Sequence, residues 1–260
     1  METKKTILNQ IMSIGGIFTK NNIYSSKAKT KVGSFLNAHK ITKQLLKDQL
    51  IRQLPTITRV RNKRQETFYC ITGKGANYIG RREELKSKVP KSPNNVMHES
   101  MKFDIALAFL RLYPDYDITI RYDVIVNRIK PDITIFLENR NTGFKYHFLV
   151  EIERKKTIDL VYKGKVLLYN TIKPEHLKQA GLRPETKYLI IYADWKFDGF
   201  LRPIEYIDQR EIALMEKRIK KLAEMSKDLP DKYRFLSFNN FEKINQPIWL
   251  SNKNNKSAII

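Results

Sequence analysis

The stretch KPDITIFLENRNTGFKYHFLVEIERKKT, residues 130–157, decides the fold of the larger part of this chain. It contains two apolar runs rich in β-branched and aromatic residues, at 132–138 and 145–153, and both have the composition of strands. Between them lies NRNTGF (139–144), a short loop with the Asn and Gly that favour tight turns. The stretch therefore predicts two antiparallel strands joined as a hairpin.

Three carboxylates gather at one end of this predicted hairpin. Asp132 opens the first strand after a proline, and Glu151 and Glu153 lie near the end of the second. Because side chains alternate between the faces of a strand, the two glutamates share one face, and hairpin pairing brings Asp132 close to them. Two interpretations are open. The carboxylates bind Mg²⁺ through their hard oxygen donors, or they solvate the hairpin end beside three basic residues, Arg154, Lys155 and Lys156.

The flanking sequence predicts an α+β domain with a mixed sheet around this hairpin. Helical and strand patterns follow in the order α-β-β-β-α-β-α-β, at 97–113, 116–126, 132–138, 145–153, 158–172, 186–194, 208–228 and 232–238. We place this domain at 96–245. The residues after it, 246–260, form a polar tail, of which SNKNNKSAII (251–260) is expected to fray.

The first third of the chain has a different pattern. Apolar spacing predicts a helix over 6–17, a second helix that begins within 27–38, and a third over 43–54 that Thr42 caps and Pro55 ends.

Two strand-like runs follow, at 56–61 and 66–72, and GKGANYIG (73–80) opens a closing helix. Three helices followed by a two-stranded hairpin is the order of a winged helix-turn-helix domain. We place that domain at 1–88, followed by a linker at 89–95.

The net charge is concentrated in the same third of the chain. The whole sequence carries +22, and residues 1–95 contribute +15 through 20 Lys and Arg against 5 Asp and Glu. Such an excess attracts polyanions such as duplex DNA. The residues predicted to contact DNA lie on the third helix and in the hairpin: Lys43, Gln44, Lys47, Arg59, Arg61, Lys63 and Arg64. Two other interpretations stay open, a solvated helical domain and a protein–protein module of the winged-helix type.

Composition limits the class and the compartment. With 42% hydrophobic residues the chain can bury a core, and its single cysteine, Cys70, excludes an intramolecular disulfide and a cysteine-rich zinc site. No run of about 18 apolar residues predicts a membrane span, and the first residues lack the apolar stretch of a signal peptide. We expect a cytoplasmic protein without a membrane partner.

The order α-βββ-α-β, with Pro131-Asp132 at the second strand and an acidic pair on the third, resembles the PD-(D/E)xK nuclease superfamily. Two registers are possible. Glu151-Ile152-Glu153 keeps apolar residues before and between the acids, as a core strand requires, but puts Glu153 in place of the superfamily's lysine. Glu153-Arg154-Lys155 matches the pattern by letter.

This resemblance implies a restriction-endonuclease-like domain with a site for Mg²⁺ or Mn²⁺. Asp132 and Glu151 would bind the metal, and Glu153 would bind it or orient water. The resemblance also implies a cation that stabilises charge, for which the candidates are Lys155 and Lys165. It further implies an additional acid, for which the candidate is Glu99.

Over roughly residues 5–195 the chain also resembles the replication-relaxation proteins of bacterial plasmids and mobile elements. The resemblance rests on five short segments, YCITGKGANYIG, MHES, KPD, LVEIERKKT and KGKVLLY. It implies a winged helix fused to a restriction-endonuclease-like domain that acts in plasmid replication or transfer, alongside other replication or transfer proteins. Three activities stay open: a Mg²⁺-dependent DNA endonuclease, a non-catalytic DNA-binding factor, and a transcriptional regulator whose second domain forms a homodimer.

Overall fold

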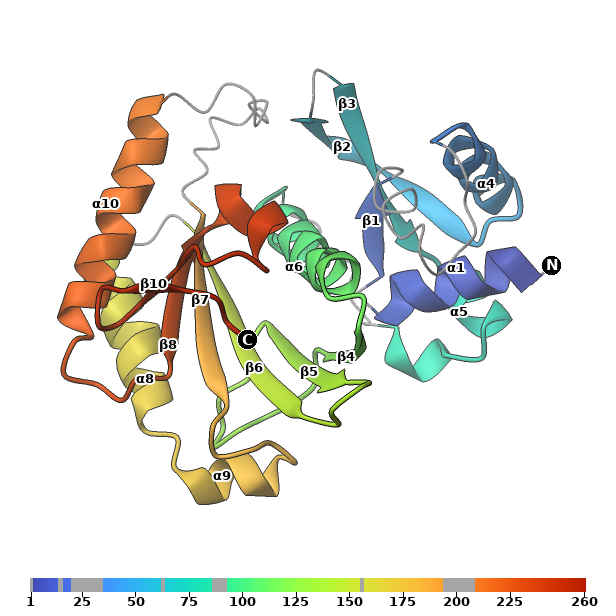
Figure 1. Ribbon diagram of the computed structural model, residues 1–260. Coiled ribbons are helices and arrows are strands. Elements are labelled where there is room, and N and C mark those ends of the chain that lie inside the picture. Colours follow the sequence, from blue (N-terminus) through green and yellow to red (C-terminus); the bar gives the residue numbers. More distant parts are fainter. Residues whose placement is uncertain are drawn as a thin grey trace. The chain divides into compact units, whose positions relative to one another are not determined.

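The computed structural model describes residues 2–13, 16–19, 35–61, 64–85, 93–154, 157–193 and 209–260. The chain divides into two compact units, and of the described residues the first unit holds those up to Leu107 and the second those from Ala108 onward (Figure 1). The division falls inside helix α6 (Pro93–Leu112), C-terminal to the predicted linker. Both units contain helices and strands and the larger sheet is mixed, so the α+β class with a mixed sheet is confirmed.

The first unit contains a three-stranded antiparallel sheet in the order β1-β3-β2. In chain order its elements are α1 (Glu2–Ser13), β1 (Ile17–Thr19), α4 (Phe35–Lys47), β2 (Ile51–Arg61), β3 (Arg64–Ile71), α5 (Gly73–Tyr78) and the 3-10 turn η1 (Arg82–Glu84). The central strand β3 pairs with β1 on one side and with β2 on the other. The predicted hairpin and the closing helix after it are confirmed.

The helices before this hairpin differ from those predicted. α1 ends at Ser13, and Ile17, which the apolar spacing assigns to the first helix, begins β1. The second predicted helix begins within 27–38; residues 27–34 of this range lie outside the described residues, and α4 begins at Phe35. The third predicted helix, 43–54, is correct only over 43–47, because α4 ends at Lys47 and the chain continues as β2 through Pro55.

Local geometry explains the early end of α4. Gln49 adopts a φ of 60°, which turns the chain out of the helix. Ile51 then pairs with Ile71, so apolar residues spaced for one helix divide between a helix end and a strand start. Thr42 lies inside α4, where its hydroxyl donates a 2.8 Å hydrogen bond to the Ala38 carbonyl instead of capping a helix.

The second unit is built on a seven-stranded sheet in the order β10-β9-β8-β7-β6-β5-β4. In chain order the strands are β4 (Tyr116–Arg121), β5 (Ile133–Asn139), β6 (Lys145–Arg154), β7 (Lys187–Ala193), β8 (Tyr233–Ser237), β9 (Trp249–Ser251) and β10 (Lys256–Ser257). β4, β5 and β6 are antiparallel to one another, whereas β6, β7 and β8 are parallel. The predicted hairpin around 139–144 is confirmed as β5–β6.

The strand predicted over 116–126 is shorter in the structure. β4 ends at Arg121. Beyond it the chain makes a tight turn, in which Asn127 and Arg128 adopt positive φ and Val126 bridges to Ile129. The β-branched residues of this segment therefore line a turn rather than extend the sheet.

Helices pack on both faces of this sheet. α7 (Ile158–Val161), the π turn η2 (Tyr162–Val166) and α8 (Leu167–Asn170) form one helical segment, which lies on the same side of the sheet as α10 (Gln209–Met225) in Figure 1. On the opposite face, near the end of α6, the ring of Phe109 packs 5.9 Å from that of Phe148. The unit also contains α9 (Pro174–Gln179), which the sequence patterns do not predict, and the 3-10 turn η4 (Phe238–Lys243).

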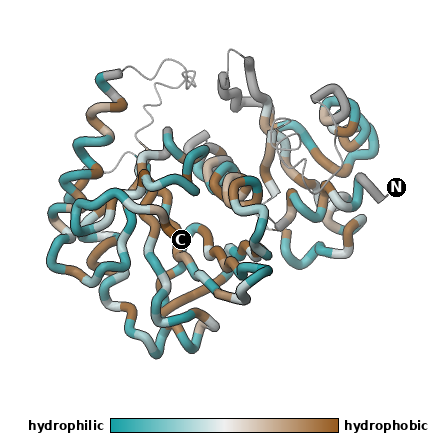
Figure 2. The backbone as a smooth tube through the Cα atoms, in the orientation of Figure 1, coloured by the Kyte–Doolittle hydropathy of each residue, from teal (hydrophilic) through white to brown (hydrophobic). Residues whose placement is uncertain are grey.

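β6 is buried on both faces. All six residues from Phe148 to Glu153 are buried, because β6 has a strand on each side and helices above and below. Figure 2 shows hydrophobic residues along the central strands, and hydrophilic residues on the surface loops. Two glutamates at the end of such a strand lie in the core and need partners there.

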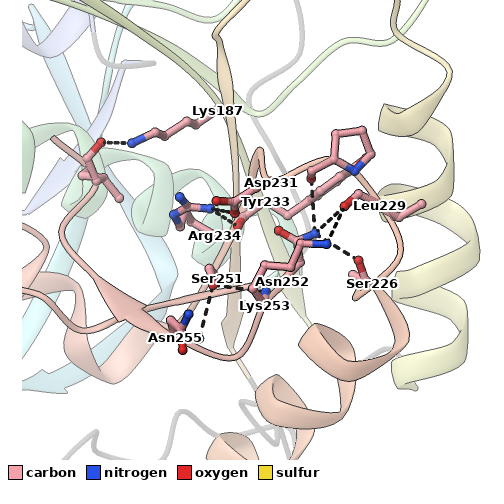
Figure 3. A network of polar contacts seen from close by, with 12 residues as sticks. Lys187, Ser226, Leu229, Asp231, Tyr233, Arg234, Ser251, Asn252, Lys253 and Asn255 are labelled. Atoms are coloured by element: carbon pink, nitrogen blue, oxygen red, sulfur yellow. Dashed lines mark hydrogen bonds and ion pairs between the residues drawn. The ribbon is translucent and has the colours of Figure 1, made fainter.

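The last residues are part of the fold, so the prediction that 251–260 frays is wrong. β9 pairs with β8, and β10 pairs with β9. The side-chain amide of Asn252 donates to three backbone carbonyls in the turn before β8, those of Ser226, Leu229 and Pro230 (Figure 3). Lys187 in turn donates a 2.6 Å hydrogen bond to the carbonyl of Ile259.

Replacing Trp249 with alanine is expected to destabilise the protein by about 3–5 kcal/mol. The Trp249 side chain is fully buried, and its indole N–H donates a 2.8 Å hydrogen bond to the Ile244 carbonyl. Urea unfolding measures the loss, and Lys256→Ala, an exposed change in the neighbouring strand, should cost less than about 0.5 kcal/mol. Equal stability of Trp249→Ala and the wild type would show that the segment frays in solution.

Candidate functional site

Asp132 lies at the end of the β5–β6 hairpin that is opposite its turn. Ile133, the first residue of β5, pairs with Val150 of β6. The Oδ2 atom of Asp132 accepts a 2.9 Å hydrogen bond from the backbone N–H of Ile152. This bond holds the aspartate beside the acidic segment of β6, as the strand pairing predicts.

Glu151 is held from two sides by one helical segment. Its Oε2 atom lies 2.9 Å from Nζ of Lys165, and its Oε1 atom accepts a 2.7 Å hydrogen bond from the hydroxyl of Tyr169. Lys165 and Tyr169 are four residues apart, so their side chains project from one face of the segment. The Glu151 side chain is only 1% exposed, so protein groups rather than water neutralise its charge.

Glu153 shares the same lysine. Its Oε1 atom lies 3.8 Å from Nζ of Lys165, and its side chain is 4% exposed. In the parallel pairing of β6 with β7, Glu153 is the neighbour of Tyr192, whose hydroxyl accepts a 3.0 Å hydrogen bond from Arg218 of α10. The site is thus formed at the carboxyl ends of β6 and β7, together with two helical segments.

Burial dominates the electrostatics of this cluster. It raises the pKa of Glu151 to about 7, and the nearby charge of Asp132 adds to the rise, while Lys165 and Tyr169 oppose it. Burial works against the charged form of Lys165, but the carboxylates of Glu151, Glu153 and Asp132 outweigh it and raise the pKa of the lysine. The ammonium therefore stays charged at neutral pH, beside the carboxyl groups of Glu151 and Glu153.

The interpretation of the acids as a solvated hairpin end is wrong for the two glutamates. Glu151 and Glu153 are 1% and 3% exposed. The strand order explains why the glutamates are buried rather than solvated. β7 pairs with β6 on the side that a lone hairpin would leave open. The helical segment 158–170 then covers the face that carries both acids.

The other predicted site residues are not brought into this cluster by any described contact. Lys155 lies outside the described residues. Glu99 belongs to α6 in the first unit, where its carboxylate lies 3.1 Å from Nζ of Lys102. Of the predicted set, the structure therefore brings together Asp132, Glu151, Glu153 and Lys165.

Carboxylate oxygens are the donors that Mg²⁺ prefers. In the described ranges, however, no three His, Cys, Asp or Glu side chains form a group that could hold a metal ion. The ammonium of Lys165 already lies within 4 Å of both Glu151 and Glu153. The residues fit a divalent ion in their chemistry, provided that the lysine moves off the carboxylates.

The predicted DNA-contacting residues lie on α4 and in the β2–β3 hairpin. Four exposed polar residues form one stripe on α4 at spacings of three and four, Lys40, Lys43, Gln44 and Lys47, and the helix contains no Asp or Glu. Gln44 donates a 2.8 Å hydrogen bond to Asp48 just beyond the helix. In the hairpin, Lys63 lies outside the described residues, while β2 and β3 place the backbone of Arg59, Arg61 and Arg64, with Arg61 paired to Arg64.

Sequence reasoning missed or misassigned two of these residues. It did not include Tyr169 in the acidic cluster, although a position four residues after Lys165 already places both side chains on one face of the helical segment. It omitted Lys40 from the DNA-contacting set, because the predicted third helix began after it. In each case the helical spacing places the missed residue on the same face as a predicted one. This spacing can be used only when the bounds of the helix are known.

Replacing Glu151 with glutamine is expected to stabilise the protein increasingly as the pH rises from about 4.5 to about 7. In this window the folded wild type keeps a proton on Glu151 that the unfolded chain has lost, so its free energy of unfolding falls with rising pH. The difference between variant and wild type should grow by about 3 kcal/mol across the window. Urea unfolding at several pH values measures it, with the exposed Glu138→Gln as the control.

Within the described residues, none of the helices combines the length and the continuous apolar sequence that a bilayer crossing requires. Comparison with protein-family models, with curated proteins and with solved structures finds no match to this chain. The resemblances to replication-relaxation proteins and to PD-(D/E)xK nucleases therefore remain predictions.

Proposed function

We propose that this protein binds duplex DNA through its first unit, which is a winged helix-turn-helix domain. The observation that carries the proposal is the lysine stripe on α4. The element order α1-β1-α4-β2-β3 and the sheet order β1-β3-β2 suit that fold, with β2–β3 as the wing. In this assignment α4, not the helix predicted over 43–54, enters the major groove.

Charge supports the same assignment. An α-helix that presents Lys40, Lys43 and Lys47 on one face, without an acidic residue, can pair with several phosphates at once. Arg59, Arg61 and Arg64 lie in the strands of the proposed wing, and the wing of such a domain contacts the flanking phosphates or the minor groove. The net charge of +22 adds a long-range attraction.

Binding to duplex DNA as a function of salt tests this proposal. Fluorescence anisotropy with a labelled duplex should give an affinity that falls steeply between about 50 and 200 mM salt, as expected for release of several counterions. The binding should persist in EDTA. Affinity that is weak and independent of salt would contradict DNA binding and favour the protein–protein interpretation of the winged helix.

The second candidate function is Mg²⁺- or Mn²⁺-dependent hydrolysis of phosphodiester bonds in the second unit. The observation that favours it is the cluster of Asp132, Lys165 and the buried Glu151 and Glu153, at the carboxyl end of β6. The element order α6-β4-β5-β6, then the helical segment and β7, suits a restriction-endonuclease-like core. A bound metal ion would supply a water of lowered pKa and would offset charge on the phosphate.

Each residue has a proposed role in this candidate function. Asp132 and Glu151 would hold the metal, and Glu153 would hold it or orient water. Lys165 would stabilise charge on the phosphate. It would supply the positive charge of the superfamily's lysine, whose position in the strand is occupied here by Glu153. Lys155 is the alternative cation and Glu99 the additional acid.

The rival functions share the DNA-binding unit and differ in the second. A non-catalytic replication or transfer factor of plasmids or mobile elements keeps the scaffold without chemistry, and a dimeric regulator uses it to pair two copies. Footprinting separates the regulator, because a homodimer protects two half-sites about one helical turn apart. Cleavage of supercoiled plasmid in Mg²⁺, Mn²⁺ and EDTA separates the nuclease from both. We place all three in the cytoplasm, with plasmid replication or transfer proteins as partners.

A further inference from the structure

The ammonium of Lys165 lies within 4 Å of two buried carboxylates at once. Its Nζ atom lies 2.9 Å from Glu151 Oε2 and 3.8 Å from Glu153 Oε1. The two glutamate side chains are 1% and 4% exposed, whereas the lysine side chain is 25% exposed. Of these three residues, the lysine is thus the one whose side chain reaches solvent.

The helical segment around the lysine is suited to such a movement. Lys165 lies in the π turn between α7 and α8, and π turns of this kind occur frequently at functional sites. The preceding Gly164 is exposed, and a side chain there would meet no atom within 4 Å. Tyr169 stays bonded to the other oxygen of Glu151, so it would hold the carboxylate in place after the lysine leaves.

We propose that Lys165 is a built-in competitor for a divalent cation at this site. It neutralises Glu151 and Glu153 while no metal is bound, and it gives way when a divalent ion takes their oxygens. The displaced ammonium then faces solvent and can pair with a phosphate of DNA. The inference rests on the second candidate function and states what the chain itself must do to admit the metal.

The physical reason is repulsion between like charges. A divalent ion on these carboxylates would lie within a few ångströms of the ammonium, in a region screened from water. The glutamates therefore bind each of the two cations more weakly when the other is present. Because linkage is reciprocal, metal binding must weaken the contact of the lysine, and removal of the lysine charge must strengthen metal binding.

Isothermal titration of the full-length protein with Mn²⁺, without DNA and at about pH 8, where the Glu151 carboxyl is ionised, tests the first half of this linkage. Lys165→Gln should bind Mn²⁺ about tenfold more tightly than the wild type, because it removes the competing charge. Lys165→Arg keeps the charge and should show no tightening. Lys163→Gln, an exposed lysine of the same π turn, is the matched control and should stay within about twofold of the wild type.

Amine acetylation of the wild type, read by peptide mass spectrometry, tests the second half and does not depend on the folding of any variant. Saturating Mn²⁺ should raise the modification rate of Lys165 several-fold relative to that of Lys163. An unchanged or slower rate, or equal Mn²⁺ affinity of Lys165→Gln and the wild type, overturns the competitor role while leaving the metal site intact. No Mn²⁺ binding by either protein overturns the inference and the hydrolytic function together, and leaves DNA binding by the first unit untouched.

Discussion

Asp132→Asn is expected to abolish metal-dependent cleavage of supercoiled plasmid and to leave duplex binding unchanged. The substitution keeps an oxygen that can accept the N–H of Ile152, so the local fold is retained. It removes one negative charge from the proposed metal ligands, and the loss of such a ligand should lower the cleavage rate at least about 100-fold. Gel analysis of nicked and linear products over time measures this rate.

The matched control is Asp117→Asn on the neighbouring strand β4, where the carboxylate is exposed and pairs with Arg140. It makes the same chemical change in the same sheet, away from the acidic cluster, and should cleave at the wild-type rate. Full cleavage by Asp132→Asn would move the active centre elsewhere. No cleavage by the wild type in Mg²⁺ or Mn²⁺ would favour the non-catalytic factor, with Lys165 as a permanent counterion of the buried glutamates.

The acidic cluster was largely predictable because its geometry follows from one hairpin. The alternation of Phe148, Val150 and Ile152 fixes the face of the two glutamates, and a six-residue loop fixes the pairing that brings Asp132 to them. The burial of the glutamates was not predictable from these residues. It depends on β7 and on the helical segment, which are distant in sequence and pack only in the folded sheet.

The errors have a common physical origin. Leu45, Leu46, Leu50 and Leu54 have a helical spacing, but the positive φ of Gln49 breaks the helix, and a non-glycine residue gives no sequence signal of that conformation. In the last residues, strands of two and three residues are too short to show a periodicity. In both places tertiary pairing decided what local sequence left open.

Replacing Lys40, Lys43 and Lys47 together with glutamine is expected to lower duplex affinity about 100-fold at moderate salt. The three ammonium groups form one exposed stripe on α4, so a helix in the major groove would no longer neutralise the phosphates that they face. The slope of log affinity against log salt should become shallower by about three, roughly one for each ammonium group that is removed. Anisotropy titrations at four or five salt concentrations measure both quantities.

A second triple variant separates direct binding by α4 from general attraction. Lys217, Lys220 and Lys221 are exposed on α10 of the second unit, so their replacement by glutamine removes the same net charge from a different surface. If α4 binds DNA directly, this control should weaken affinity by less than about threefold, because it reduces only the long-range field. Equal weakening in the two variants would mean that the charge of the whole protein, rather than α4, holds the DNA, and the winged-helix assignment would be without its main support.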